Sequence, residues 1–143
     1  MKRVFMALAA TLGLAACGQA TATTIAVIKD PACGCYTEWV EHLRREGFTV
    51  SVTDTPDQPA RSAGLGVPEA LRGCHTATIG GYVIEGHVPA ADIRRLLAER
   101  PKAIGLAVPG MPMGSPGMEQ GGRTEPYVTV LFDQASGRVF ARH

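Results

Sequence analysis

The sequence predicts a single α/β domain over residues 24–143. Segments rich in β-branched residues alternate with amphipathic segments in the order β-α-β-α-β-β-α, and glycines and prolines separate them. Two further strand-like segments close the chain as a C-terminal hairpin. The first seven elements have the order of thioredoxin and glutaredoxin. We therefore expect a thioredoxin/glutaredoxin-like three-layer domain with a central mixed sheet and an additional C-terminal hairpin.

The first half of the domain is predicted from apolar spacing and from residues that end elements. Residues 24–28 are mostly β-branched and stop before Pro31, which is typical of a buried strand. After the Cys33-Gly34-Cys35 loop, residues 37–46 carry apolar side chains at helical spacing and end at Gly47. Residues 48–52 alternate between polar and apolar side chains, which indicates a second strand.

The second half begins with a polar segment that leads to a short turn or helical piece at residues 67–71. Residues 76–79 and 82–85 are predicted strands of a hairpin, because Gly80-Gly81 between them is a tight-turn sequence. A helix is expected over residues 89–100, with a proline in its first turn. Residues 105–122 show no period and predict a loop. The final hairpin is expected from residues 127–132 and 138–140.

The N-terminus predicts export. Lys2 and Arg3 precede an apolar run, residues 4–16, that is too short to span a bilayer permanently. Leu14-Ala15-Ala16-Cys17 matches the lipobox of bacterial lipoproteins, so we expect residues 1–16 to be a signal peptide, Cys17 to be lipidated and residues 17–23 to be a linker. Cleavage after residues 20–22 of an ordinary signal peptide is the alternative. Since Gly18 is not an aspartate, the predicted location is the periplasm, anchored to the outer membrane.

The net charge and the number of cysteines exclude some classes of function. Removing residues 1–16 from the 143 leaves 127, which suits one domain. The formal net charge is +1, and loss of Lys2 and Arg3 makes it −1, with scattered arginines; nucleic-acid binding is therefore disfavoured. Cys33, Cys35 and Cys74 remain after processing. An odd count in an oxidising compartment means that at least one thiol is free, bound to metal or joined to another molecule.

These three cysteines predict a soft-metal site. Thiolates favour Cu(I), and no acidic cluster typical of a magnesium or calcium site lies near them. Gly34 lets the backbone aim Cys33 and Cys35 at one ion, whereas a disulfide between them would close a very small ring. Both precede a predicted helix, whose dipole favours a thiolate. A disulfide from Cys74 to either of them, or burial as small apolar residues, is the alternative.

Histidines and methionines extend this candidate ligand set. His75 is either a ligand or a surface residue, and His87 is either a ligand or a cap of the following helix. His42 and His143 are expected to be solvated. Thioethers bind Cu(I) without losing a proton, and three of them lie in the Pro/Gly-rich loop; gap-filling at the domain edge is their alternative role. The candidate ligands among them are Met111, Met113 and Met118.

A family resemblance is carried by ordered sequence blocks: Cys33-Gly34-Cys35 before Trp39, Gly66-Val67-Pro68, Cys74-His75-Thr76-Ala77, Gly81 to Ala90, Gly105 to Pro112 and Gly114 to Glu119. Together they resemble the CopG-type family of exported bacterial copper-resistance proteins. The resemblance implies a thioredoxin-like domain that binds a cysteine-bridged, redox-active copper cluster in the periplasm, beside copper efflux systems. One departure is Tyr36, where the family pattern Cys-Gly-Cys-Cys has its last cysteine.

We therefore expect a binding protein rather than an enzyme, apart from a Cu(I)/Cu(II) redox role. It would sequester copper for tolerance, or pass it to an efflux system or periplasmic carrier. A thiol-disulfide oxidoreductase is the second interpretation, although Tyr36 removes the Cys-x-x-Cys pair. A zinc-binding protein is the third, because three cysteines and one histidine suit tetrahedral zinc.

Overall fold

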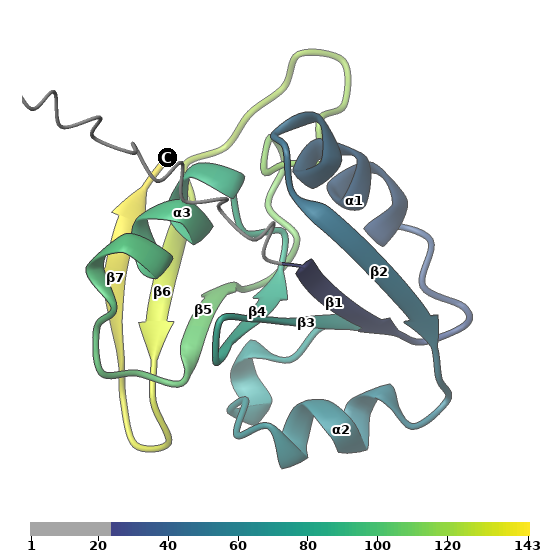
Figure 1. Cartoon of the computed structure of the whole chain (residues 1–143). Coiled ribbons are helices and arrows are strands. Elements are labelled where there is room, and N and C mark those ends of the chain that lie inside the picture. Colours follow the sequence, from purple (N-terminus) through teal and green to yellow (C-terminus); the bar gives the residue numbers. More distant parts are fainter. Residues whose placement is uncertain (1–23) are drawn as a thin grey trace, which may run out of the picture.

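A computed structural model describes residues 24–143 as a seven-stranded mixed sheet with three α-helices (Figure 1). The elements, in chain order, are β1 (Thr24–Lys29), α1 (Tyr36–Arg45), β2 (Thr49–Asp54), α2 (Gln58–Gly64), a 3-10 turn (Glu69–Leu71), β3 (His75–Ile79), β4 (Tyr82–Gly86), α3 (Ala90–Glu99), β5 (Gly105–Val108), β6 (Val128–Phe132) and β7 (Gly137–Arg142). The predicted signal peptide and Cys17 lie outside the described residues.

The sheet has the strand order β2-β1-β3-β4-β5-β6-β7. β1 pairs in parallel with β2, and β4 with β5; the other neighbours are antiparallel. Because β1 is antiparallel to β3, the end of β1 lies beside the start of β3, with Lys29 opposite His75. This register brings the loop after β1 next to Cys74, which directly precedes β3.

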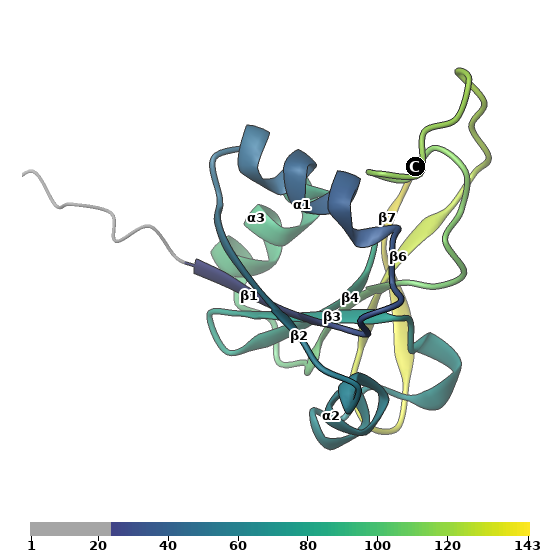
Figure 2. The ribbon, with the colours of Figure 1, turned by 90° about the vertical axis from the view of Figure 1, so that its right-hand side faces the viewer.

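Helices cover both faces of the sheet. Figure 2 shows α1 and α3 on one face and α2 on the other. The larger apolar core lies under α1 and α3, where Trp39 and Leu43 of α1 and Ile93 of α3 are fully buried. A smaller cluster contains Val67, Val83, Ala107 and Phe132. The apolar stripe predicted for residues 37–46 therefore does face the sheet. No helix within residues 24–143 has the length and apolar character required to cross a bilayer.

Two elements differ from the sequence-based prediction. α2 forms at residues 58–64, before the predicted helical piece, and the latter is only a 3-10 turn. Pro59 lies in the first turn of α2, where its missing N–H costs no hydrogen bond, so the proline that indicated a loop is compatible with a helix. Residues 105–108, predicted as loop, form the buried strand β5. Gly105 fits there because a Cβ would collide with the carbonyl of Val83 on β4.

The remaining elements confirm the prediction, with ends that shift by at most two residues.

Candidate metal centre

Asp30 shapes the loop that carries the first two cysteines. Its carboxylate accepts the backbone N–H of Ala32 at 2.8 Å, and its carbonyl accepts the N–H of Cys33 at 2.9 Å. The Asp30 N–H donates to the carbonyl of Cys74 at 3.0 Å. The end of β1, the cysteine loop and the start of β3 are therefore joined by backbone hydrogen bonds, which hold the two sequence-distant cysteine segments together.

The three cysteine sulfurs converge at this point. Cys33 and Cys74 form a disulfide, with their Cα atoms 5.8 Å apart. The Sγ of Cys35 lies 3.6 Å from that of Cys33 and 3.5 Å from that of Cys74. With His75, the four ligand atoms all lie within 4.8 Å of one another. Of the two roles open for Cys74, the structure shows the disulfide, and the same atoms form a compact group that could hold a metal ion.

His75 adds a nitrogen to the sulfur group from the first position of β3. It is buried, and its Nδ1 lies 3.9 Å from the Sγ of Cys33 and 4.0 Å from that of Cys74. The ring packs 5.0 Å from that of Trp39 and at the same distance, edge to face, from that of His87. His75 is therefore a core residue at the site and not a surface histidine.

His87 is fully buried and does not cap α3, whose N-cap is Pro89 and has no side-chain capping bond. Its Nδ1 lies 2.8 Å from the carbonyl oxygen of Pro116. Because a carbonyl can only accept, Nδ1 donates, and the lone pair lies on Nε2. The Nε2 atoms of both His75 and His87 are buried without a hydrogen-bond partner among the described residues. A backbone carbonyl that fixes the tautomer is typical of histidines that bind metal through the other nitrogen.

Burial controls the protonation of the site. It lowers the pKa of His75 to about 4, with a smaller contribution from repulsion by His87, so His75 is neutral near pH 7. Burial likewise lowers the pKa of His87. For Cys35, at the N-cap of α1, burial raises the pKa despite an opposing backbone hydrogen bond. Desolvation is therefore the larger of these two effects on the Cys35 thiol.

A cavity of about 150 Å³ opens beside the sulfurs. Its lining includes Cys35, Cys74, His75 and His87 together with Met111. Met111 is 53% exposed, so its thioether lies at the solvent side of the cavity. Cys33 is only 7% exposed and does not line this cavity, so ions and small reactants reach the group from the side of Cys35 and Cys74.

The other two methionines lie elsewhere in the loop. Met113 and Met118 are half-buried, and neither lines the cavity beside the sulfurs. The loop is ordered by its own turns, and Gly117 touches the first turn of α1, where a Cβ would lie 2.6 Å from the Trp39 nitrogen. Through the Pro116 carbonyl, the same loop contacts His87. The methionine loop thus joins α1 to the candidate site.

Tyr36 packs against Lys29 and does not line the cavity beside the sulfurs. Its ring packs under the ammonium of the buried Lys29, which is 4.6 Å from the ring centroid and pairs with Asp54 at 2.9 Å.

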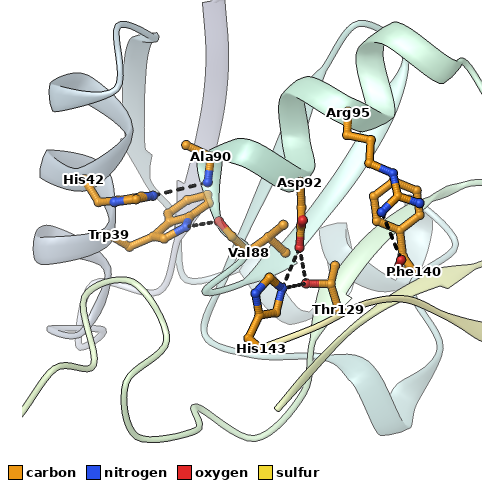
Figure 3. Close-up of polar contacts among 9 residues, drawn as sticks. All are labelled: Trp39, His42, Val88, Ala90, Asp92, Arg95, Thr129, Phe140 and His143. Carbon is orange, nitrogen blue, oxygen red and sulfur yellow. Dashed lines mark hydrogen bonds and ion pairs between the residues drawn. The ribbon is translucent and has the colours of Figure 1, made fainter. Parts of the chain in front are cut away.

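His42 is half-buried and His143 is exposed, and the side chains of both make polar contacts that the sequence did not predict (Figure 3). His42 accepts the N–H of Ala90 at 3.2 Å, beside the 2.9 Å bond from the Trp39 indole to the Val88 carbonyl, so both bonds attach α1 to the start of α3. His143 lies 2.9 Å from Asp92 and stacks on a tyrosine ring. Neither contact is visible in the local sequence.

Sequence reasoning missed a buried carboxylate that supports the site. Glu85 on β4 is fully buried and accepts the N–H of Gly73 at 2.6 Å and the hydroxyl of Thr76 at 2.7 Å. Ser62 of α2 adds a longer bond of 3.3 Å. Since Gly73 directly precedes Cys74, Glu85 positions the cysteine segment from outside the sulfur group. The sequence did contain one indication of this role, because Glu85 is the charged residue in an otherwise apolar predicted strand.

Comparison with known proteins adds an independent observation. A family model described as "Protein of unknown function, DUF411" matches residues 71–118. A solved structure of "Copper resistance protein copG- Form 2" is 44% identical, with a TM-score of 0.79 over 85% of this chain and 98% of the other. "Copper resistance protein copG- Form 1" is 45% identical, with a TM-score of 0.78 over 84% and 96%. No curated protein sequence matches. On this identity and coverage, the chain belongs to the CopG family of copper resistance proteins.

Proposed function

We propose that this protein binds Cu(I) through the thiolates of Cys33, Cys35 and Cys74 and thereby contributes to copper tolerance. The observation that carries the proposal is the convergence of three sulfurs and the His75 nitrogen within 4.8 Å. Sulfur-rich sites favour Cu(I) over hard cations. The relatives named copper resistance proteins support the same metal.

Nitrogen and thioether ligands complete the proposed site. Burial lowers the pKa of both histidines, so each can supply a lone pair without first losing a proton; His75 presents its Nδ1 to the sulfurs, and His87 has an unpartnered Nε2. Met111 at the rim of the cavity can take up Cu(I) from solvent. Met113 and Met118 are proposed to act only if the loop moves, because they lie away from the cavity.

The cellular setting of the proposal follows from the N-terminal sequence. We propose export to the periplasm, a lipid anchor at Cys17 and transfer of copper to an efflux system or carrier. We also propose a thioredoxin-like domain with the cysteine loop between its first strand and first helix. The order β2-β1-β3-β4, with α1 and α3 on one face, supports that assignment.

Two alternatives each have one supporting observation. The Cys33–Cys74 disulfide favours a thiol-disulfide oxidoreductase, which an insulin-reduction assay would detect. The Cys₃His group is also an acceptable tetrahedral zinc site. Met111 on the cavity favours copper over zinc, because zinc sites are built from cysteine, histidine and carboxylate ligands.

Competitive titration of the reduced protein tests the proposal. Cu(I) held by a chromophoric chelator is titrated anaerobically, with and without stoichiometric Zn(II). We expect tight Cu(I) binding that zinc does not prevent and that His75→Gln weakens. His42→Gln is the matched control, because His42 is a partly buried histidine outside the sulfur group. Retention of zinc against Cu(I) would show that the metal assignment is wrong.

A further inference from the structure

We propose that the metal centre is closed by a reversible Cys33–Cys74 disulfide and is opened by an external dithiol that attacks Cys74. This inference rests on the proposed copper site and adds its regulation by thiol–disulfide exchange. It starts from one fact: the two sulfurs joined in the disulfide also belong to the group that could hold a metal.

The disulfide and the metal compete for the same atoms. Metal binding requires thiolates, and a disulfide sulfur carries no negative charge. In the closed form, only Cys35 and His75 of the four candidate ligands are still available to bind a metal. Linkage then works in both directions: closure weakens copper binding, and bound copper protects the reduced pair by the same factor.

Access determines which sulfur is attacked. Cys74 is half-buried and lines the 150 Å³ cavity, whereas Cys33 is 7% exposed and does not line it. A thiolate that enters through the cavity meets Cys74 first. The rate of exchange depends on which sulfur is accessible, so Cys74 is the expected point of attack.

Cys35 does not open the disulfide by itself. Its Sγ lies 3.6 Å from Cys33 and 3.5 Å from Cys74, and these nearly equal distances place it beside the bond. A displacing thiolate must approach along the extension of the sulfur–sulfur bond. Cys35 therefore stays a thiol while Cys33 and Cys74 are joined, and an outside reductant is required.

The exchange balances in two steps. A thiolate of the dithiol bonds to the Sγ of Cys74, the Cys33–Cys74 bond breaks, and Cys33 leaves as a thiolate. The second thiol of the reductant then displaces Cys74, whose sulfur also leaves as a thiolate. The dithiol becomes a disulfide, and its two electrons pass to the cysteine pair. Its two protons go to solvent when copper binds the thiolates, or to the cysteines when no metal is present.

The test compares oxidised and reduced forms of the purified protein. After mild oxidation, alkylation and peptide mapping should find Cys35 modified and Cys33 linked to Cys74. In the chelator titration, the oxidised form should bind Cu(I) with an affinity more than about 100-fold lower than that of the reduced form. Loss of a residue that only supports a ligand lowers metal affinity by roughly 100-fold at most, and here ligands themselves are lost. Dithiothreitol, used as the dithiol and then removed, should restore binding. A thioredoxin with only its attacking cysteine should form a mixed disulfide at Cys74.

Two variants keep the test decisive. Cys35→Ser should still close on oxidation. Cys74→Ser should not close, and its weaker copper binding should no longer respond to oxidation. Equal Cu(I) affinity of both wild-type forms overturns the closure but leaves the copper function standing, whereas failure of the reduced protein to bind Cu(I) overturns both. A mapped disulfide that includes Cys35, or an adduct on Cys33, refutes the assigned chemistry.

Discussion

Replacing Glu85 with alanine should destabilise the fold and weaken the metal centre together. The carboxylate is fully buried and accepts bonds from Gly73, Thr76 and Ser62 at 2.6, 2.7 and 3.3 Å. Truncation leaves these donors without their acceptor. Each buried unsatisfied donor costs about 1–3 kcal/mol, but hydroxyls rotate to other acceptors, and removing a buried charge returns some energy. We expect a net loss of about 3 kcal/mol in the free energy of unfolding.

Glu85→Gln is the matched control. The amide keeps two polar atoms and nearly the same volume, so the loss at pH 7 should stay below about 1 kcal/mol. Urea unfolding of the reduced proteins, followed by circular dichroism, measures both values. Equal losses in the two variants would refute the hydrogen-bond argument.

The same pair of proteins tests the protonation of Glu85. Burial raises the pKa of Glu85 above its ordinary value of 4.5. The folded state therefore holds this proton more tightly, and the stabilisation is fully present below pH 4.5 and is lost as pH rises through the raised pKa. Wild type should lose stability relative to Glu85→Gln as pH rises above 4.5. The opposite trend would contradict a desolvated carboxyl.

Copper binding gives the functional readout. Gly73 adjoins Cys74, so loss of its bond to Glu85 should let the cysteine segment move. In the chelator titration, Glu85→Ala should bind Cu(I) at least about tenfold more weakly, while Glu85→Gln should remain near wild type. Unchanged affinity in a folded Glu85→Ala protein would show that Glu85 does not position the cysteine.

Three further outcomes are expected. His75 has a low pKa, about 4 against an ordinary 6.5, so its stabilisation of the fold is complete above pH 6.5. About 3 kcal/mol of unfolding free energy should be lost as pH falls through 4. In urea unfolding, His75→Gln should reduce this loss of stability at acid pH. Gly117→Ala should cost about 2 kcal/mol in unfolding free energy, more than Gly121→Ala, because both have positive φ but only Gly117 has backbone of α1 within 4 Å. Met111→Ala should weaken Cu(I) binding about tenfold in the chelator titration, whereas Met113→Ala should leave it unchanged.

Most of the fold could be predicted because its strands and helices have strong local patterns. The stripe of Trp39, Val40 and Leu43 repeats at helical spacing, and the Gly80-Gly81 turn specifies a hairpin. β5 was missed because four buried residues followed by proline show no period; its strand conformation comes from pairing with β4 and β6. α2 was missed because Pro59 and Gly64 are residues typical of a loop. Pro59 is compatible with a helix only because it lies in the first turn.

The candidate site was predicted in its chemistry and only partly in its geometry. Cys33, Cys35 and Cys74 could be predicted as candidate metal ligands, because cysteines in a glycine-containing loop or at a strand start are more often ligands or redox groups than core residues. The roles of His42 and His143 could not be predicted, since their partners, Ala90 and Asp92, lie 48 and 51 residues away in the chain.

The sequence by itself determined the candidate ligand types, most of the helices and strands, and the membership in a family, because these depend on residue identity and short-range spacing. Only the tertiary structure decided which of those ligands meet. The pairing of Lys29 with His75 across β1 and β3 brings Cys74 within 3.5 Å of Cys35, and the turn after β5 places Met111 on the cavity, whereas Met113 and Met118 do not line it. Such distances depend on strand register and loop packing between residues far apart in the chain. No local pattern encodes them.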